Sequence, residues 1–218
     1  EFRACDRIEK SRIIEKQIAP LDKGMTMGEV ISKVSTAFDD DAIMVTDVGQ
    51  HQMMATRYFR FKQTRSVVTS GGLGTMGFGL PAAMGAKLGA PDRPVCLFVG
   101  DGGFQMTIQE LGTIFQTKIP VKIVLLNNNF LGMVRQWQEL FFDKRYASTE
   151  LINPDFQTIA KGYHVPSVKI SERDKLDEAI KLMIETDGPF LVEVMVEKEG
   201  NVFPMVPAGA SVSDIRLE

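Results

Sequence analysis

Two polar residues, Asp101 and Asn128, each follow a short apolar run, and their side chains are of types that bind metal ions. The run 95–99 is too short for a helix and rich in β-branched and aromatic residues, which predicts a buried strand. The run 121–126 predicts a second buried strand, and three asparagines follow it at 127–129. A carboxylate and an amide carbonyl are hard oxygen ligands suited to Mg²⁺, which completes its coordination with phosphate oxygens and water.

A helix predicted over residues 104–116 separates these two strands, so the unit reads strand, helix, strand. Right-handed crossovers bring the C-terminal ends of parallel strands to one edge of a sheet, and open α/β sheets bind their ligands at that edge. Gly102 and Gly103 have no Cβ, so the backbone N–H groups that follow can approach an anion closely. The unit therefore predicts a site for a metal-bridged phosphate or diphosphate.

Both polar groups also occur as ordinary turn formers, and either one alone favours a turn. Their presence at the ends of two strands around one helix favours the binding site.

Several stretches of the chain resemble a known family. Gly100-Asp101-Gly102, followed at this distance by paired asparagines, resembles the diphosphate-binding motif of thiamine diphosphate enzymes. Longer stretches are similar to the large catalytic subunit of acetohydroxyacid synthase (acetolactate synthase): VGQHQM (48–53), TSGGLGTMGFGLPAA (69–83), NNNFLGMVRQWQ (127–138), LINPDF (151–156) and PMVP (204–207). The resemblance extends from about residue 46 to residue 207. The stretch 129–131 is more apolar than the family pattern. This difference does not affect a metal ligand that is a backbone carbonyl, because every residue type has one.

The resemblance implies an α/β fold in three layers, with a doubly wound, mainly parallel sheet and helices on both faces (the ThDP-binding fold). Residues 25–218 would form the domain that binds the diphosphate and Mg²⁺. The charge-dense residues 1–24 would be a helix or linker from two preceding domains, a pyrimidine-binding domain and a middle domain, that this sequence lacks.

The resemblance also implies specific site residues. Asp101, Asn128 and the backbone carbonyl of Phe130 would bind the metal. The residues expected to contact the cofactor are Val48, Gly49, Gln50, His51, Gly74, Met76, Asp101, Gly102, Gly103, Asn128, Phe130, Leu131, Gly132 and Met133.

Three of these assignments depend on the resemblance. Spacing alone would make His51 a surface histidine at a helix start, whereas the family context makes it a donor to a phosphate oxygen. A lone methionine such as Met76 is usually a core gap filler; in the family, a bulky apolar residue here holds the cofactor bent. Residues 130–142 read as an amphipathic helix packed on the sheet, but Met133, Val134 and Trp137 would face the substrate.

Trp137 stands at the family's substrate-selecting position. A rigid apolar wall of this kind discriminates one methylene group by roughly 1–3 kcal/mol, the difference between pyruvate and 2-ketobutyrate as acceptor. Its neighbour Arg135 is expected to be solvated or to face a partner.

The implied enzyme decarboxylates pyruvate and transfers the two-carbon unit to a second 2-keto acid, giving 2-acetolactate or 2-aceto-2-hydroxybutyrate for branched-chain amino acid synthesis. Its activating glutamate belongs to a neighbouring subunit's pyrimidine domain, so no catalytic residue is assigned here and the chain alone is expected to be inactive. FAD is expected mostly outside this chain, in a homo-oligomer (dimer or tetramer) with a possible regulatory small subunit. The alternatives are another ThDP-dependent decarboxylase, oxidase or carboligase, or a non-catalytic binding domain.

Composition limits the partners and the location. The chain has 25 basic and 28 acidic residues, so nothing indicates nucleic-acid binding. No apolar run approaches the roughly 18 residues that span a membrane, and no signal peptide is recognisable. Cys5 and Cys96 are expected to be unpaired, which favours a reducing compartment. The expected location is the cytoplasm of a bacterium or an organelle of a eukaryote.

The remaining pattern predicts the other elements. Thr26 is a candidate N-cap with Glu29 as its capping-box partner. Further strands are expected over 42–48, 65–69, 165–170 and 190–196, and a further helix over 175–186.

Overall fold

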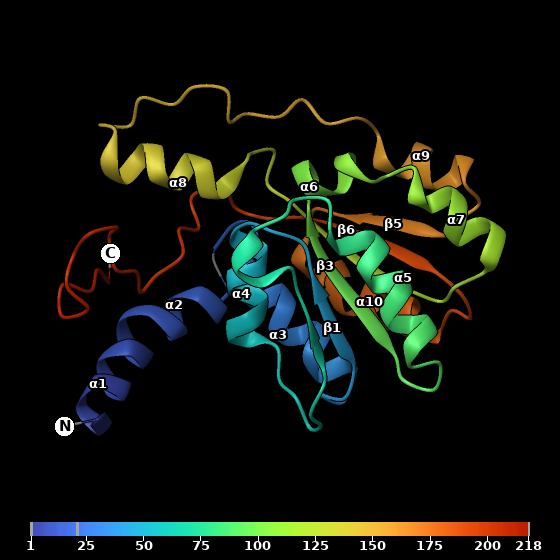
Figure 1. Ribbon diagram of the computed structural model, residues 1–218, viewed down its shortest axis with the longest axis horizontal. Helices are drawn as coiled ribbons and strands as arrows, with labels where there is room; N and C mark the ends of the chain where they lie inside the picture. The colour runs from blue at the N-terminus through green and yellow to red at the C-terminus, as the bar shows by residue number, and fades with distance from the viewer. Residues whose placement is uncertain (1, 21, 218) are drawn as a thin grey trace.

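The computed structural model describes residues 2–20 and 22–217. Its six strands form one parallel sheet in the order β2-β1-β3-β4-β6-β5 (Figure 1). The strands are β1 (Ile43–Thr46), β2 (Val67–Val68), β3 (Val95–Gly100), β4 (Lys122–Asn127), β5 (Ser167–Ile170) and β6 (Phe190–Met195). All the predicted strands are present, and the predicted α/β fold with a parallel sheet is confirmed.

Helices cover both faces of this sheet. They are α1 (Phe2–Glu9), the π-helical turn η1 (Lys10–Ile14), α2 (Glu15–Ile18), α3 (Met27–Ala37), α4 (Gln50–Tyr58), the 3₁₀ turn η2 (Gly71–Leu73), α5 (Gly79–Gly89), α6 (Asp101–Met106), α7 (Glu110–Thr117), α8 (Gly132–Phe141), α9 (Phe156–Gly162), the 3₁₀ turn η3 (Arg173–Lys175) and α10 (Leu176–Glu185). No helix within the described residues is long and apolar enough to cross a membrane.

The alternation of side chains along the strands builds two cores. On one face, residues such as Met44, Phe98 and Val124 pack against α3, α4 and α10. On the other face, residues such as Leu97 and Ile123 pack against α5, α7 and α9. Strands buried on both faces explain why the apolar runs are continuous rather than alternating in the sequence.

Three helices extend beyond the sheet. Helix α8 and the N-terminal helices α1 and α2 project from the same side of the sheet, and the C-terminal segment runs between them (Figure 1). The N-terminal helices end with α2 at Ile18, and the Gln17 carbonyl accepts a hydrogen bond from the Thr26 hydroxyl at 2.5 Å, which ties α2 to the start of α3. The division into linker and domain stays a prediction.

Two local predictions need correction. The helix predicted over 104–116 is broken between α6 and α7, because Thr107 leaves the helical conformation and its hydroxyl donates to the Gly77 carbonyl at 2.9 Å. Thr26 caps α3 as predicted, accepting the N–H of Glu29 at 3.0 Å. The Glu29 side chain, however, is 2.7 Å from Arg173 Nε in an ion pair instead of completing a capping box.

Candidate functional site

A cavity lies at the C-terminal ends of β1, β3 and β4. Ligands bind at this edge in open α/β sheets. Its lining includes Val48, Gly49, Gln50, His51, Met76, Asp101, Gly102, Gly103, Asn128, Phe130, Leu131, Gly132, Met133 and Val134, with Met27, Gly100 and Leu126. Two residues expected at the site, Gly74 and Trp137, do not line the cavity.

Asp101 and Asn128 enter this cavity from adjacent strands. Gly100 at the end of β3 pairs with Leu126 of β4, so the residues that follow lie at the same height of the sheet. Asp101 is the first residue of α6 and Asn128 directly follows β4, and both side chains are buried. Asn128 Oδ1 accepts the N–H of Phe130 at 3.1 Å, which turns the chain so that Phe130 also lines the cavity.

The Asp101 carboxylate lies in an environment that disfavours its charge. Burial raises its pKa to about 6, and the hydrogen bond from Asn153 acts in the opposite direction. No cluster of three or more histidine, cysteine, aspartate or glutamate residues that could hold a metal exists within the described residues. The donor set is therefore one carboxylate with amide and backbone oxygens, which fits Mg²⁺ with phosphate and water better than it fits Zn²⁺.

Two buried polar atoms of the cavity lining have no hydrogen-bond partner among the residues that the structure describes. They are Gln50 Oε1 and His51 Nε2, from the two residues that open α4. Burial lowers the pKa of His51 to about 4, with nearby Asp47 acting in the opposite direction, so the ring is neutral at pH 7. A neutral imidazole on a helix N-terminus can donate one hydrogen bond to an anion. Gly49 precedes the helix with φ 147°, which requires glycine.

The glycine-rich loop that carries Met76 is tied to β1 by Asp47. Asp47 is fully buried, and its carboxylate accepts the N–H groups of Gly77 at 3.2 Å and Gly79 at 2.7 Å. This bond pair places Met76 on the cavity wall beside Gly102. The sequence analysis missed Asp47, although an acidic residue at the end of an apolar strand is the signal that marks it.

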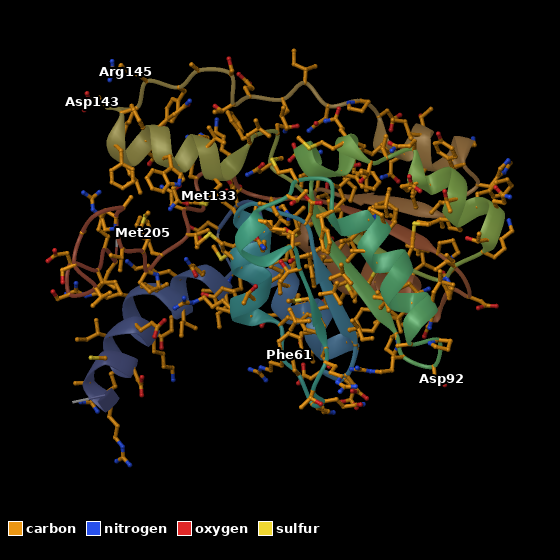
Figure 2. All side chains as sticks on the ribbon, in the orientation of Figure 1. Phe61, Asp92, Met133, Asp143, Arg145 and Met205 are labelled. Carbon is orange, nitrogen blue, oxygen red and sulfur yellow. The ribbon has the colours of Figure 1, made fainter. Side chains whose placement is uncertain are left out.

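Helix α8 brings only part of the predicted substrate set to the cavity. Met133 and Val134 line it, and Figure 2 shows Met133 at the end of α8 nearest the sheet, with Asp143 and Arg145 beyond its far end. Trp137 lies one turn further along, is 37% exposed and packs against Phe141 at a ring separation of 4.9 Å. In this chain Trp137 forms part of a separate surface depression with Val134.

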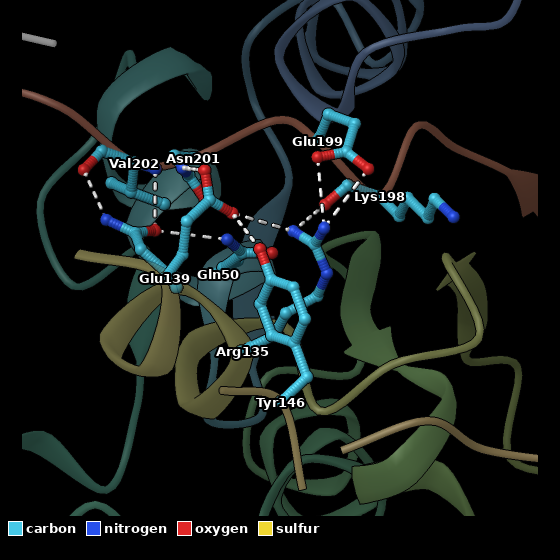
Figure 3. Close-up of polar contacts among 9 residues, drawn as sticks. Gln50, Arg135, Glu139, Tyr146, Lys198, Glu199, Asn201 and Val202 are labelled. Carbon is cyan, nitrogen blue, oxygen red and sulfur yellow. Dashed lines mark hydrogen bonds and ion pairs between the residues drawn. The ribbon is translucent and has the colours of Figure 1, made fainter. Parts of the chain in front are cut away.

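The expectation that Arg135 is solvated or faces a partner is wrong. Its guanidinium lies 3.1 Å from Glu139 and 3.0 Å from Glu199, and its side chain is buried (Figure 3). It also stacks over the ring of Tyr146, 4.7 Å from the centroid. The spacing could not reveal this, because Glu199 comes from the C-terminal segment that folds back along α8.

The neighbouring Gln136 joins the same C-terminal segment to the cavity. It exchanges two hydrogen bonds with the backbone of Val202, at 2.8 and 3.0 Å, and accepts a third from Gln50 at 3.1 Å. The cavity residue Gln50 is therefore connected through α8 to a segment far from it in the sequence.

Asn153, which the sequence pattern does not mark, contacts Asp101 directly. Its amide nitrogen lies 2.7 Å from Asp101 Oδ2. The stretch LINPDF contains Asn153, but nothing in its local pattern indicates what it contacts.

Comparison with known proteins gives a consistent identification. The family described as "Thiamine pyrophosphate enzyme, C-terminal TPP binding domain" matches residues 47–194. The acetolactate synthase large subunit of Lactococcus lactis subsp. lactis is 48% identical over 83% of this chain and 32% of its own length. Acetolactate synthase isozyme 2 large subunit of Escherichia coli is 45% identical over 85% of this chain and 34% of its own.

A solved structure shares the fold. The thiamine diphosphate-dependent 4-hydroxybenzoylformate decarboxylase of Rhodococcus jostii RHA1 matches with a TM-score of 0.76 and 29% identity, over 82% of this chain and 34% of that one. The chain thus spans about a third of the length of the relatives it matches. The resemblance of the sequence to acetohydroxyacid synthase is confirmed, and the chain belongs to the thiamine pyrophosphate enzymes as their C-terminal, TPP-binding domain.

Proposed function

We propose that this chain binds Mg²⁺ and the diphosphate of thiamine diphosphate in the cavity at the ends of β1, β3 and β4. The observation that carries the proposal is that Asp101 and Asn128 line one cavity from adjacent strands. The unpartnered buried atoms of Gln50 and His51 on the same cavity support it, since buried polar groups normally have partners.

Each residue has a distinct task in this proposal. Asp101, Asn128 and the Phe130 carbonyl would hold the metal, while Gly102, Gly103 and His51 would donate hydrogen bonds to the diphosphate. Met76 would support the bound cofactor from the glycine-rich loop, and Met133 and Val134 would shape the substrate side. Thiamine diphosphate supplies a thiazolium ring that accepts the electrons left when a 2-keto acid loses CO₂.

The proposed activity of the full-length gene product is that of an acetohydroxyacid synthase. It would decarboxylate pyruvate and join the two-carbon unit to pyruvate or 2-ketobutyrate. The identity of 48% to a protein named as an acetolactate synthase large subunit supports this reaction class. We also propose the homo-oligomeric state, FAD bound mostly outside this chain, and a regulatory subunit, as features of the whole enzyme.

The proposal is tested in two steps. Calorimetry of the full-length gene product should show thiamine diphosphate binding that requires Mg²⁺ and disappears with EDTA. The same protein should form acetolactate from pyruvate, whereas the 218-residue chain should not. Binding that is independent of the metal, or acetolactate formed by the chain alone, would contradict the proposal.

A second candidate is a 2-keto acid decarboxylase without carboligation. The structural match to a 4-hydroxybenzoylformate decarboxylase favours it, because it shows that this fold also occurs in a decarboxylase. Release of acetaldehyde in place of acetolactate from pyruvate would identify this alternative.

A further inference from the structure

The segment before α9 lies against the asparagine turn that follows β4. Phe130 and Glu150 form an antiparallel bridge, with the Leu151 N–H donating to the Asn129 carbonyl at 2.8 Å and the Leu131 N–H to the Thr149 carbonyl at 2.8 Å. This pairing places Asn153, two residues after Leu151, between the ends of β3 and β4.

The Asn153 amide nitrogen has three acceptors. It lies 2.7 Å from Asp101 Oδ2 and 3.1 Å from both Asn127 Oδ1 and Asn129 Oδ1. The Asn153 oxygen accepts from Gln105 Nε2 at 2.9 Å. In the opposite orientation, the Asn153 amide oxygen would face the Asp101 carboxylate and two other amide oxygens, none of which can donate a hydrogen bond to it. These contacts therefore fix the NH₂ end of the Asn153 amide toward Asp101.

Asn127 is itself held by a buried carboxylate. Its amide nitrogen donates to Glu193 Oε1 at 2.8 Å, and its oxygen accepts the N–H of Asn129 at 3.0 Å. Glu193 is 1% exposed and is paired with Lys169 Nζ at 2.9 Å. The Asn127 oxygen therefore occupies a defined position, and Asn153 bridges that position to Asp101.

From these contacts we propose that Asn153 is a positioning residue for the metal site. By donating to Oδ2 it orients the Asp101 carboxylate and leaves the other oxygen for the metal. By bonding both Asp101 and the asparagine turn, it holds the ends of β3 and β4 at one separation. Contacts of this kind tune metal affinity without touching the metal. The inference rests on the proposed binding of Mg²⁺ and thiamine diphosphate.

The test measures Mg²⁺ affinity by calorimetry on the full-length gene product, with thiamine diphosphate saturating. Asn153→Ala removes the donor, and Asn153→Leu removes it while keeping most of the volume. Both variants should raise the Kd for Mg²⁺ about 10- to 100-fold. The unfolding temperature of the metal-free protein should stay within about 3 °C of the wild type.

Asn201→Ala is the matched control, because its amide donates to Glu139 at 3.3 Å, away from the predicted metal ligands. Its Kd for Mg²⁺ should equal that of the wild type. The inference is overturned when Asn153→Ala and Asn153→Leu bind Mg²⁺ within about threefold of the wild type. It is also overturned when Asn201→Ala weakens binding equally, or when both Asn153 variants fail to fold without metal.

Measurements on the wild-type protein distinguish a failure of the proposed function from a failure of this inference. A wild-type protein that shows no Mg²⁺-dependent binding of thiamine diphosphate refutes the proposed function and this inference with it. Normal binding by the wild type and by both Asn153 variants refutes the inference alone.

Discussion

Asp47 and Gly79 are joined by a hydrogen bond of 2.7 Å from the glycine N–H to the carboxylate, which fastens the Met76 loop to the end of β1. Asp47→Ala would leave this N–H and that of Gly77 buried without an acceptor. We expect the free energy of unfolding to fall by about 2–4 kcal/mol, measured by urea titration. Cofactor affinity should fall as well, because Met76 loses its fixed position.

Asp39→Asn is the control for this change, since the Asp39 side chain is 93% exposed and its ion pair with Lys62, at 3.0 Å, lies on the surface. It should change stability by less than about 0.5 kcal/mol. Equal stability losses in the two variants would show that Asp47 does not anchor the loop.

Alanine substitutions at Gly103 and Gly85 should have opposite effects on the stability of the fold. A Cβ at Gly103 would lie 2.2 Å from Asp47 Oδ1, whereas a Cβ at Gly85, on the exposed side of α5, would meet no described residue within 4 Å. Gly103→Ala should therefore destabilise the fold by about 1–3 kcal/mol. Gly85→Ala should stabilise it by up to about 1 kcal/mol through helix propensity. Thermal unfolding of both variants tests this, and a neutral Gly103→Ala would contradict the close packing of α6 on β1.

Buried His51 should make stability depend on pH. Its pKa is about 4 in the folded state and 6.5 for the free side chain, so between these values the unfolded chain binds a proton that the folded chain does not. The stabilisation is complete above pH 6.5 and is lost as the pH falls toward 4. Relative to His51→Gln, the wild type should lose about 2–3 kcal/mol between pH 7.5 and pH 4.5. Parallel pH profiles for the two proteins would show that His51 is solvated.

The Asp101 carboxylate should make the stability of the metal-free protein fall as the pH rises, which is the opposite of the effect of His51. Its pKa is raised from 3.8 to about 6, so the folded state favours the proton, and this stabilisation is lost as the pH rises through 6. Asp101→Asn removes the buried charge. It should raise metal-free stability at pH 7.5 by on the order of 2–3 kcal/mol and abolish Mg²⁺-dependent binding of the cofactor. A less stable variant, or one that keeps its Mg²⁺ dependence, would contradict the assignment.

Mg²⁺ affinity of the wild type should itself increase with pH up to about 6, since the ligand must be ionised. Calorimetry at pH 5 and pH 7.5 measures this trend.

Trp137 tests the predicted substrate contact. On the prediction that it selects the acceptor, Trp137→Leu in the full-length gene product should lower the preference for 2-ketobutyrate over pyruvate about tenfold or more. Because Trp137 is 37% exposed in this chain, unfolding free energy should change by less than about 1 kcal/mol. The product ratio with both acids present is the measurement, and an unchanged ratio would remove Trp137 from the substrate site.

The sequence sufficed for the main arrangement of the site because that arrangement follows from general rules. Parallel strands joined by right-handed crossovers bring their C-terminal ends to one edge of the sheet, so the sequence alone predicts that Asp101 and Asn128 lie close together. The break at Thr107 was not predictable, because it depends on a hydrogen bond to Gly77 that only the folded chain brings near.

Partners distant in the sequence account for the other failures. Arg135 is buried because Glu199 returns to it from the C-terminal segment. Glu29 does not complete the capping box because its carboxylate forms an ion pair with Arg173, which is distant in the sequence and carries a full positive charge. Spacing within one element cannot report such pairs, and the resemblance to a family carried information on the cofactor but not on these contacts.

A domain that keeps the Asp101 carboxylate away from water without a partner cation is most easily opened when it is empty. On the proposed binding of Mg²⁺, loading the site would protect the chain by mass action against the local openings that proteases exploit. The magnesium concentration would then set both the fraction of copies that can bind the cofactor and the lifetime of each copy.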